Sequence, residues 1–148
     1  MEIKIIKVAE DKDERISIEC HEVTSQVNAI VKFVKSLQKT ITADLEGREH
    51  EIGVQDIYYV ESVDNKTYLY TRNDVYSIHE RLYEIEEALS EASFLRISKS
   101  VVVNLLKIKS IRPALNGRFS AVLINGEEVI ISRKYVPALK EKLRGKKS

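Results

Sequence analysis

The stretch 94-FLRISKSVVVNLLKIKSIRP-113 changes character in its middle. Both of its ends are apolar or alternate between apolar and polar residues, a pattern typical of β-strands. Between them the polar tripeptide Ser98-Lys99-Ser100 follows Arg96 and precedes three consecutive valines. The pattern predicts strand structure over 94–103 and 107–112, with basic and hydroxyl side chains exposed where one strand gives way to the next.

Short alternating segments surround this stretch, and turn residues separate them. The turn residues are Glu46-Gly47, the polar tip 64-DNK-66, the loop 113-PALNG-117 and Asn125-Gly126, the last being a type I′ hairpin signal. We therefore predict a meander of antiparallel strands at 40–45, 48–54, 56–62, 67–71, 75–78, 118–124 and 127–132.

Three segments have helical periodicity. Residues 22–38 place six apolar residues on one face: Val23, Val27, Ile30, Val31, Val34 and Leu37. A second helix is predicted at 78–90, with a capping box formed by Ser77 and Glu80. A third helix should begin close to Pro137, because proline is tolerated only in the first turn. The basic tail 144–148 is predicted to be loose.

The first residues alternate in two further segments. Residues 2–8 and 14–20 are predicted to be strands joined by an acidic turn, with Cys20 buried on an apolar face. Together with the helix at 22–38 they predict a small β-β-α element. The expected fold class is therefore α+β, mainly β, with antiparallel sheets preceded by this element.

Composition narrows the class of protein. With 43% apolar and 32% charged residues, the chain resembles a soluble globular protein. It has no apolar run of about 20 residues, no signal-peptide pattern and one cysteine, so we expect a cytoplasmic protein. The three histidines lack metal-ligand spacing, and no nucleotide-binding or nucleophile motif occurs. We expect no metal, no cofactor and no enzymatic activity.

Charge divides the chain into two unlike parts. Residues 1–93 hold 11 Lys/Arg and 20 Asp/Glu, a net charge of −9, whereas residues 94–148 hold 13 and 3, a net charge of +10. Such asymmetry indicates that the basic part meets a polyanion, although a solvated surface would show the same composition. Two basic clusters, Arg96 to Lys99 and Ser132 to Lys134, lie at strand ends, where loop side chains are free to bind phosphates or guanine edges.

Four pieces of the sequence, in order, resemble the LytTR DNA-binding domain of bacterial transcription regulators. They are 56-DIYYVES-62, 80-ERLYEIEEAL-89, 94-FLRISKSVVVNLLKIKSI-111 and 123-LINGEEVIISRKYVPALKEKL-143. The resemblance implies an elongated multi-sheet domain over 46–148 that places loops in successive major grooves of double-stranded DNA, often at direct repeats. Residues 1–45 would then form a separate element for dimerisation or signal input.

The resemblance also implies site residues. Lys99 falls on a contact position of a first DNA loop, Arg133 on the arginine of a second, and Asn65 and Lys66 on a weaker third region. The neighbouring side chains are assigned to backbone contacts: Arg96, Ser98, Ser100, Ser132 and Lys134. Asn104 is instead expected to cap the turn after the valines.

Two departures from the family pattern matter. Many members have His-Arg-Ser or His-Asn-Ser at positions 98–100, and Lys99 lacks the bidentate fork of arginine, which predicts softer base discrimination. The segment before the match is too short for the usual phosphorylated receiver domain, so the chain is similar to stand-alone members. Those are often encoded beside a small membrane protein that inhibits them.

Two functional hypotheses remain open at this point. In the first, a homodimeric regulator binds DNA, with dimerisation through the helix at 22–38; the apolar face of that helix would equally suit packing on the strands predicted at 2–8 and 14–20. In the second, the chain is a protein-interaction module or anti-activator whose basic half binds an acidic protein.

Overall fold

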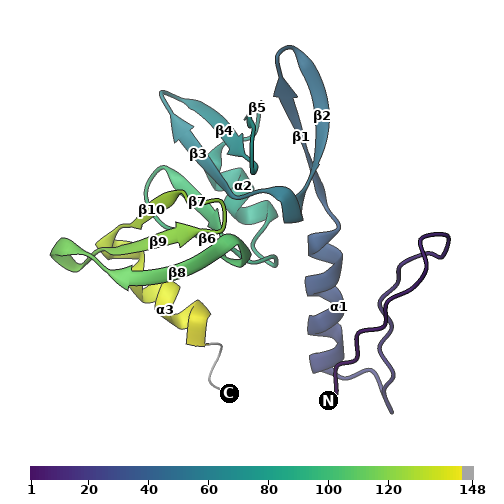
Figure 1. Cartoon of the computed structure of the whole chain (residues 1–148). Coiled ribbons are helices and arrows are strands. Elements are labelled where there is room, and N and C mark those ends of the chain that lie inside the picture. Colours follow the sequence, from purple (N-terminus) through teal and green to yellow (C-terminus); the bar gives the residue numbers. More distant parts are fainter. Residues whose placement is uncertain (145–148) are drawn as a thin grey trace.

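The computed structural model describes residues 1–144, and they form two antiparallel sheets with three α-helices (Figure 1). The large sheet has seven strands in the order β2-β1-β5-β4-β3-β7-β6, and the small sheet has three in the order β10-β9-β8. This confirms the predicted class, α+β and mainly β. The large-sheet strands are β1 (Thr40–Leu45), β2 (Arg48–Gly53), β3 (Tyr59–Val63), β4 (Lys66–Tyr70), β5 (Val75–Ile78), β6 (Phe94–Arg96) and β7 (Val101–Asn104). The others are β8 (Ile108–Pro113), β9 (Phe119–Leu123) and β10 (Glu128–Ile131), with helices α1 (Ser25–Leu37), α2 (Leu82–Ala88) and α3 (Val136–Arg144).

The valine run of β7 lies between two hydrophobic cores. Val102 packs into the core that the large sheet forms with α2, where Ile85 and Leu89 are also buried. Val103 faces the second core, which joins the β6–β7 end of the large sheet to the small sheet and α3. Because successive side chains of a strand point to opposite faces, a strand covered on both faces is apolar at every position.

Three hairpin turns fix the register of the strands. Glu46-Gly47 and Asp64-Asn65 have positive φ at both positions, as a type I′ turn requires. The type I′ prediction for Asn125-Gly126 was wrong, because only Gly126 has positive φ (92°). Here the amide of Gly126 donates to Leu123 O (2.9 Å) and that of Leu123 to Glu127 O (2.7 Å), which closes a three-residue loop.

The second helix begins later than the capping box predicted. Ser77 lies in β5, opposite Tyr68 of β4, so the strand continues through Ile78. Helix α2 starts at Leu82, and the amide of Arg81 donates to Glu84 Oε1 at 3.0 Å. Pairing with β4 therefore overrides the local helix signal. The third helix begins at Val136 with Pro137 in its first turn, as predicted.

The first helix is capped by Thr24, whose hydroxyl accepts from the amide of Val27 at 3.3 Å. α1 extends away from both sheets, and β1 continues the chain into the large sheet (Figure 1). β1 pairs there with β2 and β5, so the element predicted at 1–45 is attached through a sheet strand. No helix among residues 1–144 is long and apolar enough to cross a membrane.

The strand predictions for 2–8 and 14–20 were wrong. Residues 1–22, here called the N-terminal arm, are extended but belong to no ladder of the described residues. A turn closes at their midpoint, where the amide of Lys12 donates to Ala9 O at 3.0 Å. Cys20, which was expected to be buried, is exposed. The two segments alternate as strands do, but neither pairs with a strand of the described residues. Of the tail predicted to be loose, residues 145–148 lie outside the described residues.

Candidate nucleic-acid interface

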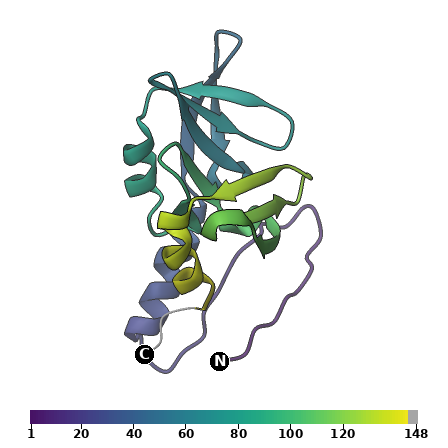
Figure 2. The same cartoon turned by 90° about the vertical axis from the view of Figure 1, so that its left-hand side faces the viewer.

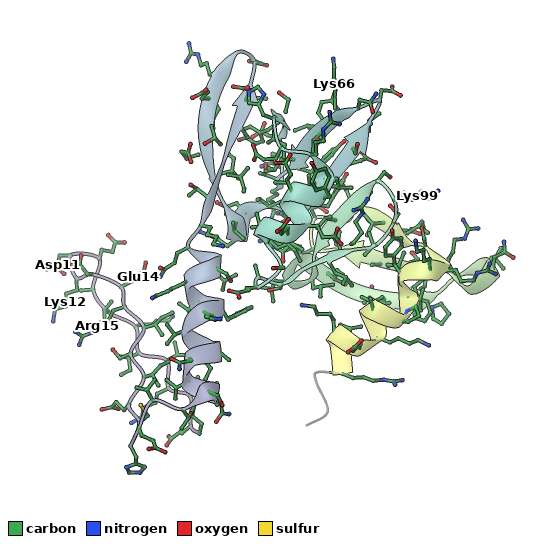
Figure 3. All side chains as sticks on the ribbon, turned by 180° about the vertical axis from the view of Figure 1, so that it is seen from behind. Asp11, Lys12, Glu14, Arg15, Lys66 and Lys99 are labelled. Carbon is green, nitrogen blue, oxygen red and sulfur yellow. The ribbon has the colours of Figure 1, made fainter. Side chains whose placement is uncertain are left out.

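The turn between β6 and β7 presents Lys99 to solvent. The amide of Ile97 donates to Val101 O at 3.0 Å, and the amide of Ser100 donates to Ser98 Oγ at 3.2 Å. Both serines are half-buried and their hydroxyls lie 3.5 Å apart, whereas Lys99 at the apex is exposed. The turn is therefore held from inside while its lysine projects outward (Figure 3).

Arg96 holds this turn. Its Nε donates to Ser98 O (2.8 Å), its Nη1 to Glu86 Oε1 (3.1 Å), and its Nη2 to Lys99 O. The side chain is 20% exposed and forms an ion pair with Glu86 of α2. The guanidinium group thus donates to the carbonyl oxygens of Ser98 and Lys99, within the turn itself. The sequence assigned Arg96 to a DNA contact, and nothing in its type or position predicted these bonds or the role of Glu86.

The segment after β10 lies directly beside this turn. The amide of Ser132 donates to Ile97 O at 2.8 Å, and the amide of Tyr135 donates to Ser132 O at 2.8 Å. The helical turn that follows exposes Arg133 and Lys134, with Lys134 Nζ 5.7 Å from the ring centroid of Tyr135. The second basic cluster is thereby fixed to the first by a main-chain hydrogen bond.

Gly117 supports the side chain of Arg133. This glycine has a φ of 75°, and a Cβ built on it would lie 2.8 Å from Arg133 Cδ. A larger residue at 117 would displace the arginine stem. The sequence placed 113–117 in a loop but gave no sign that the loop packs against Arg133.

The tip of the β3–β4 hairpin adds a third loop on the same side of the molecule. Asn65 and Lys66 are exposed there, and the amide of Ser62 in β3 donates to Ser100 O at 2.8 Å. Lys66 and Lys99 appear on one side of the molecule in Figure 3. In Figure 1 the β3–β4 tip, the β6–β7 turn and the end of β10 follow one another along the left-hand side.

Asn104 lies at the end of β7, opposite Phe94 of β6, and is 1% exposed. Its Oδ1 accepts from the amide of Leu106 at 3.0 Å, which confirms the predicted cap of the following turn. Its Nδ2 donates to Ile57 O at 2.9 Å, a long-range bond that the sequence did not reveal.

Two stacked tyrosines form a polar cluster in the large sheet. The rings of Tyr59 and Tyr70 are 4.2 Å apart, and Tyr70 Oη donates to Glu61 Oε1 at 3.0 Å. Burial, together with this hydrogen bond, raises the pKa of Tyr70 to about 12. Burial and the nearby Glu127 carboxylate also raise the pKa of Tyr59.

The arrangement suits binding of an anionic surface. Exposed ammonium and guanidinium groups on three linked loops can donate to phosphate oxygens and to base edges. Among residues 1–144 no three His, Cys, Asp or Glu side chains lie close enough together to hold a metal ion.

Residues 47–144 match the family model of the LytTr DNA-binding domain. The chain belongs to the LytTr DNA-binding domain family. A solved LytTr DNA-binding domain, from a Bacillus cereus protein described as a methyl-accepting/DNA response regulator, has a TM-score of 0.67 and 29% identity. That match covers 72% of this chain and 97% of the other. A LytTr domain is a DNA-binding module of transcription regulators, so the predicted family is confirmed.

Two groups of relatives match different lengths of the chain. Sensory transduction protein LytT of Bacillus anthracis is 34% identical over 93 residues, which are 63% of this chain and 38% of LytT. The chain thus spans well under half of the LytT proteins that it matches. An uncharacterized HTH-type transcriptional regulator of Staphylococcus aureus strain MW2 is 28% identical over 145 residues, covering 97% of this chain and 98% of its own length. The latter alignment includes the N-terminal arm and α1.

Proposed function

We propose that this chain is a sequence-specific transcription regulator whose LytTr domain inserts loops into successive major grooves of double-stranded DNA. The observation that carries the proposal is the linkage of the loops. Main-chain bonds from Ser62 to Ser100 and from Ser132 to Ile97 hold three loops along one side of the molecule, and each loop exposes a lysine or an arginine. A rigid row of loops can follow the grooves of a duplex without a recognition helix.

Each loop residue has a role in this proposal. Lys99 and Arg133, exposed at the centres of their loops, read base edges, and Asn65 with Lys66 contacts a neighbouring site. Ser98, Ser100, Ser132 and Lys134 contact phosphates, which position the domain without reading sequence. Arg96 acts by holding the Lys99 turn, because its donors are engaged within the chain.

The proposal places a homodimer on direct repeats in the cytoplasm. Residues 46–148 would contact DNA, while residues 1–45 would join two protomers or receive a signal. The loops of Lys99 and Arg133 lie in the basic part of the chain, whereas residues 1–45 hold 7 Lys/Arg and 8 Asp/Glu and are nearly neutral.

Salt dependence separates this function from its alternative, a module that binds an acidic protein. DNA fragments selected by the purified chain from genomic DNA would supply the operator. Its affinity should fall as salt rises, with a log–log slope of about −0.9 for each phosphate neutralised. Affinity that is the same for selected and scrambled DNA at every salt concentration would contradict the proposal.

A matched pair of variants tests the loop assignment. Arg133→Ala should weaken binding to the operator by the equivalent of about 1–3 kcal/mol and relax the preference at one base position. Lys134→Ala should weaken binding to all sequences alike and lower the salt slope by about 1. Equal sequence preference in both variants and the wild type would remove Arg133 from base recognition.

A further inference from the structure

The N-terminal arm exposes more apolar surface than a single chain can account for. Ile3, Ile5 and Ile16 are 88%, 90% and 72% exposed. Contiguous exposed apolar residues mark interaction sites. The arm is also extended, and its one main-chain bond among the described residues is the turn from Lys12 to Ala9. Unpaired amides and carbonyls on an extended segment are a template for another strand.

The second half of the arm covers one flank of α1. Ile16, Ile18 and Cys20 face the helix across a groove of about 410 Å³, whose other wall is the apolar stripe Val23, Val27, Val31 and Val34. A groove of this volume accepts a group of apolar side chains. The first half of the arm, residues 2–8, runs apart from the second half and from both sheets (Figure 2).

The two halves of the arm are complementary in sequence. Continuing the register set by the Ala9–Lys12 turn would place Ile5 opposite Ile16, Ile3 opposite Ile18, and Lys7 opposite Glu14. Apolar pairs and opposite charges are the cross-strand pairs that stabilise a sheet. Asp11, Lys12 and Arg15 at the arm tip point into solvent, away from α1 (Figure 3). The arm therefore carries matching strands that the single chain leaves unpaired.

The arm and α1 of one chain are too small to bury these apolar side chains and pair these main-chain groups alone. A lone two-stranded hairpin is marginally stable in water. Folding units below about 40 residues usually need disulfides, metals or oligomerisation. Two copies supply four strands and two amphipathic helices, and exchange of identical segments reuses the complementary pairs already present in each chain.

We propose that the N-terminal arms of two chains exchange, so that residues 2–8 of each copy pair with residues 14–20 of the other against the apolar stripes of both α1 helices. This inference rests on the proposed function in one respect, since it supplies the dimer that occupies two repeats. The DNA-binding domains must turn about α1 to face the same way on direct repeats. The ion pair of Lys32 with Glu91 (3.8 Å) is exposed and holds little energy, whereas the bond from the Val54 amide to Lys39 O (3.0 Å) holds the chain after the helix ends, so α1 itself can turn.

Cysteine trapping tests the exchange directly. In the full chain carrying Cys20→Ser, one preparation receives Lys7→Cys and a differently tagged preparation receives Glu14→Cys. Mixing and mild oxidation should give a disulfide-linked dimer that contains both tags, because residues 7 and 14 face each other across the exchanged strands. Lys7→Cys mixed with Glu49→Cys, in the exposed β2, should give no such product. Absence of the mixed product with Glu14→Cys would overturn the proposal.

Sedimentation and hydrogen exchange test the dimer itself. The wild type should be a dimer at micromolar concentration, with arm amides protected and losing protection on dilution. The double variant Ile3→Asp/Ile5→Asp should self-associate at least about 100-fold more weakly, whereas Ile124→Asp, at a 48% exposed site in the β9–β10 loop, should behave as wild type. A wild type that is monomeric at high micromolar concentration would overturn the exchange. That result would hold equally if the arm binds another protein instead of a second copy. Arm protection in a monomer would show a hairpin closed within one chain and would overturn it too.

DNA binding separates failure of this inference from failure of the proposed function. The double variant should bind a single-repeat duplex with unchanged affinity and lose the added affinity for two repeats. A wild-type chain that dimerises through its arms but binds no DNA would refute the function and leave the exchange standing.

Discussion

Replacing Asn104 by alanine should destabilise the LytTr domain by several kcal/mol. Two hydrogen bonds are lost: Nδ2 to Ile57 O at 2.9 Å, and the Leu106 amide to Oδ1 at 3.0 Å. A buried polar group left without its partner costs about 1–3 kcal/mol. Ile57 is fully buried, so its carbonyl should cost towards the upper end, whereas Leu106 is 58% exposed and its amide can reach water. We therefore expect a total loss of about 2–4 kcal/mol.

Urea unfolding followed by circular dichroism measures this loss. A domain of this size typically has a stability of about 5–15 kcal/mol, and a slope of about 1–3 kcal/mol per molar urea turns a 3 kcal/mol loss into a midpoint shift of about 1–3 M. The matched control is Asn73→Ala, an exposed asparagine in the β4–β5 turn, which should change stability by no more than about 0.5 kcal/mol. A loss below about 1 kcal/mol for Asn104→Ala would refute the account of Asn104 as the bond between β7 and the segment before β3.

Three further predictions concern the loops and the tyrosine cluster. Arg96→Lys keeps the charge, but a lysine cannot donate to all three acceptors of Arg96. The variant should therefore weaken operator binding nearly as much as Arg96→Met and speed amide exchange over 98–101. Binding restored by lysine would instead indicate that Arg96 contacts a phosphate directly. Gly117→Ala and Gly47→Ala both place alanine at positive φ, and each should lower stability by about 1–2 kcal/mol. Only Gly117→Ala should also lower DNA affinity, because its Cβ meets the Arg133 side chain. Equal DNA affinities of the two variants would show that packing of Gly117 against Arg133 does not matter for DNA binding. The pKa of Tyr70 is raised to about 12, so the stability that its hydroxyl gives is present below pH 10 and is lost as pH rises towards 12. The free energy of unfolding should therefore change less between pH 9 and pH 11 in Tyr70→Phe than in the wild type. The same change in both proteins would count against burial of the hydroxyl.

The strands of the LytTr domain were predictable because local signals and long-range pairing agree there. Alternation, the Asp64-Asn65 turn and the valine run of β7 all specify the same sheet. The helix prediction at 78–90 failed where they disagree, since pairing with β4 holds Ser77 in β5. The strands predicted at 2–8 and 14–20 are absent, because alternation shows that a segment suits a strand but does not show that another strand pairs with it.

Sequence reasoning proposed the residues of the candidate site but not the contacts that hold its loops. Lys99, Arg133 and Lys66 could be chosen from their resemblance to family positions, and all three are exposed on adjoining loops. The bonds that hold these loops join residues far apart in sequence, such as Ser132 with Ile97 and Arg96 with Glu86. A single sequence contains no signal for such contacts, because they depend on how the two sheets pack.

The sequence preference of the Lys99→Ala and Arg133→Ala variants tests the central claim most directly. Both preferences should be measured by selection from randomised DNA beside the wild type, with circular dichroism confirming that each variant is folded. The account predicts that each variant loses discrimination at its own base position within a repeat while keeping it at the other. If both folded variants select the wild-type sequence with wild-type affinity, these loops do not read DNA.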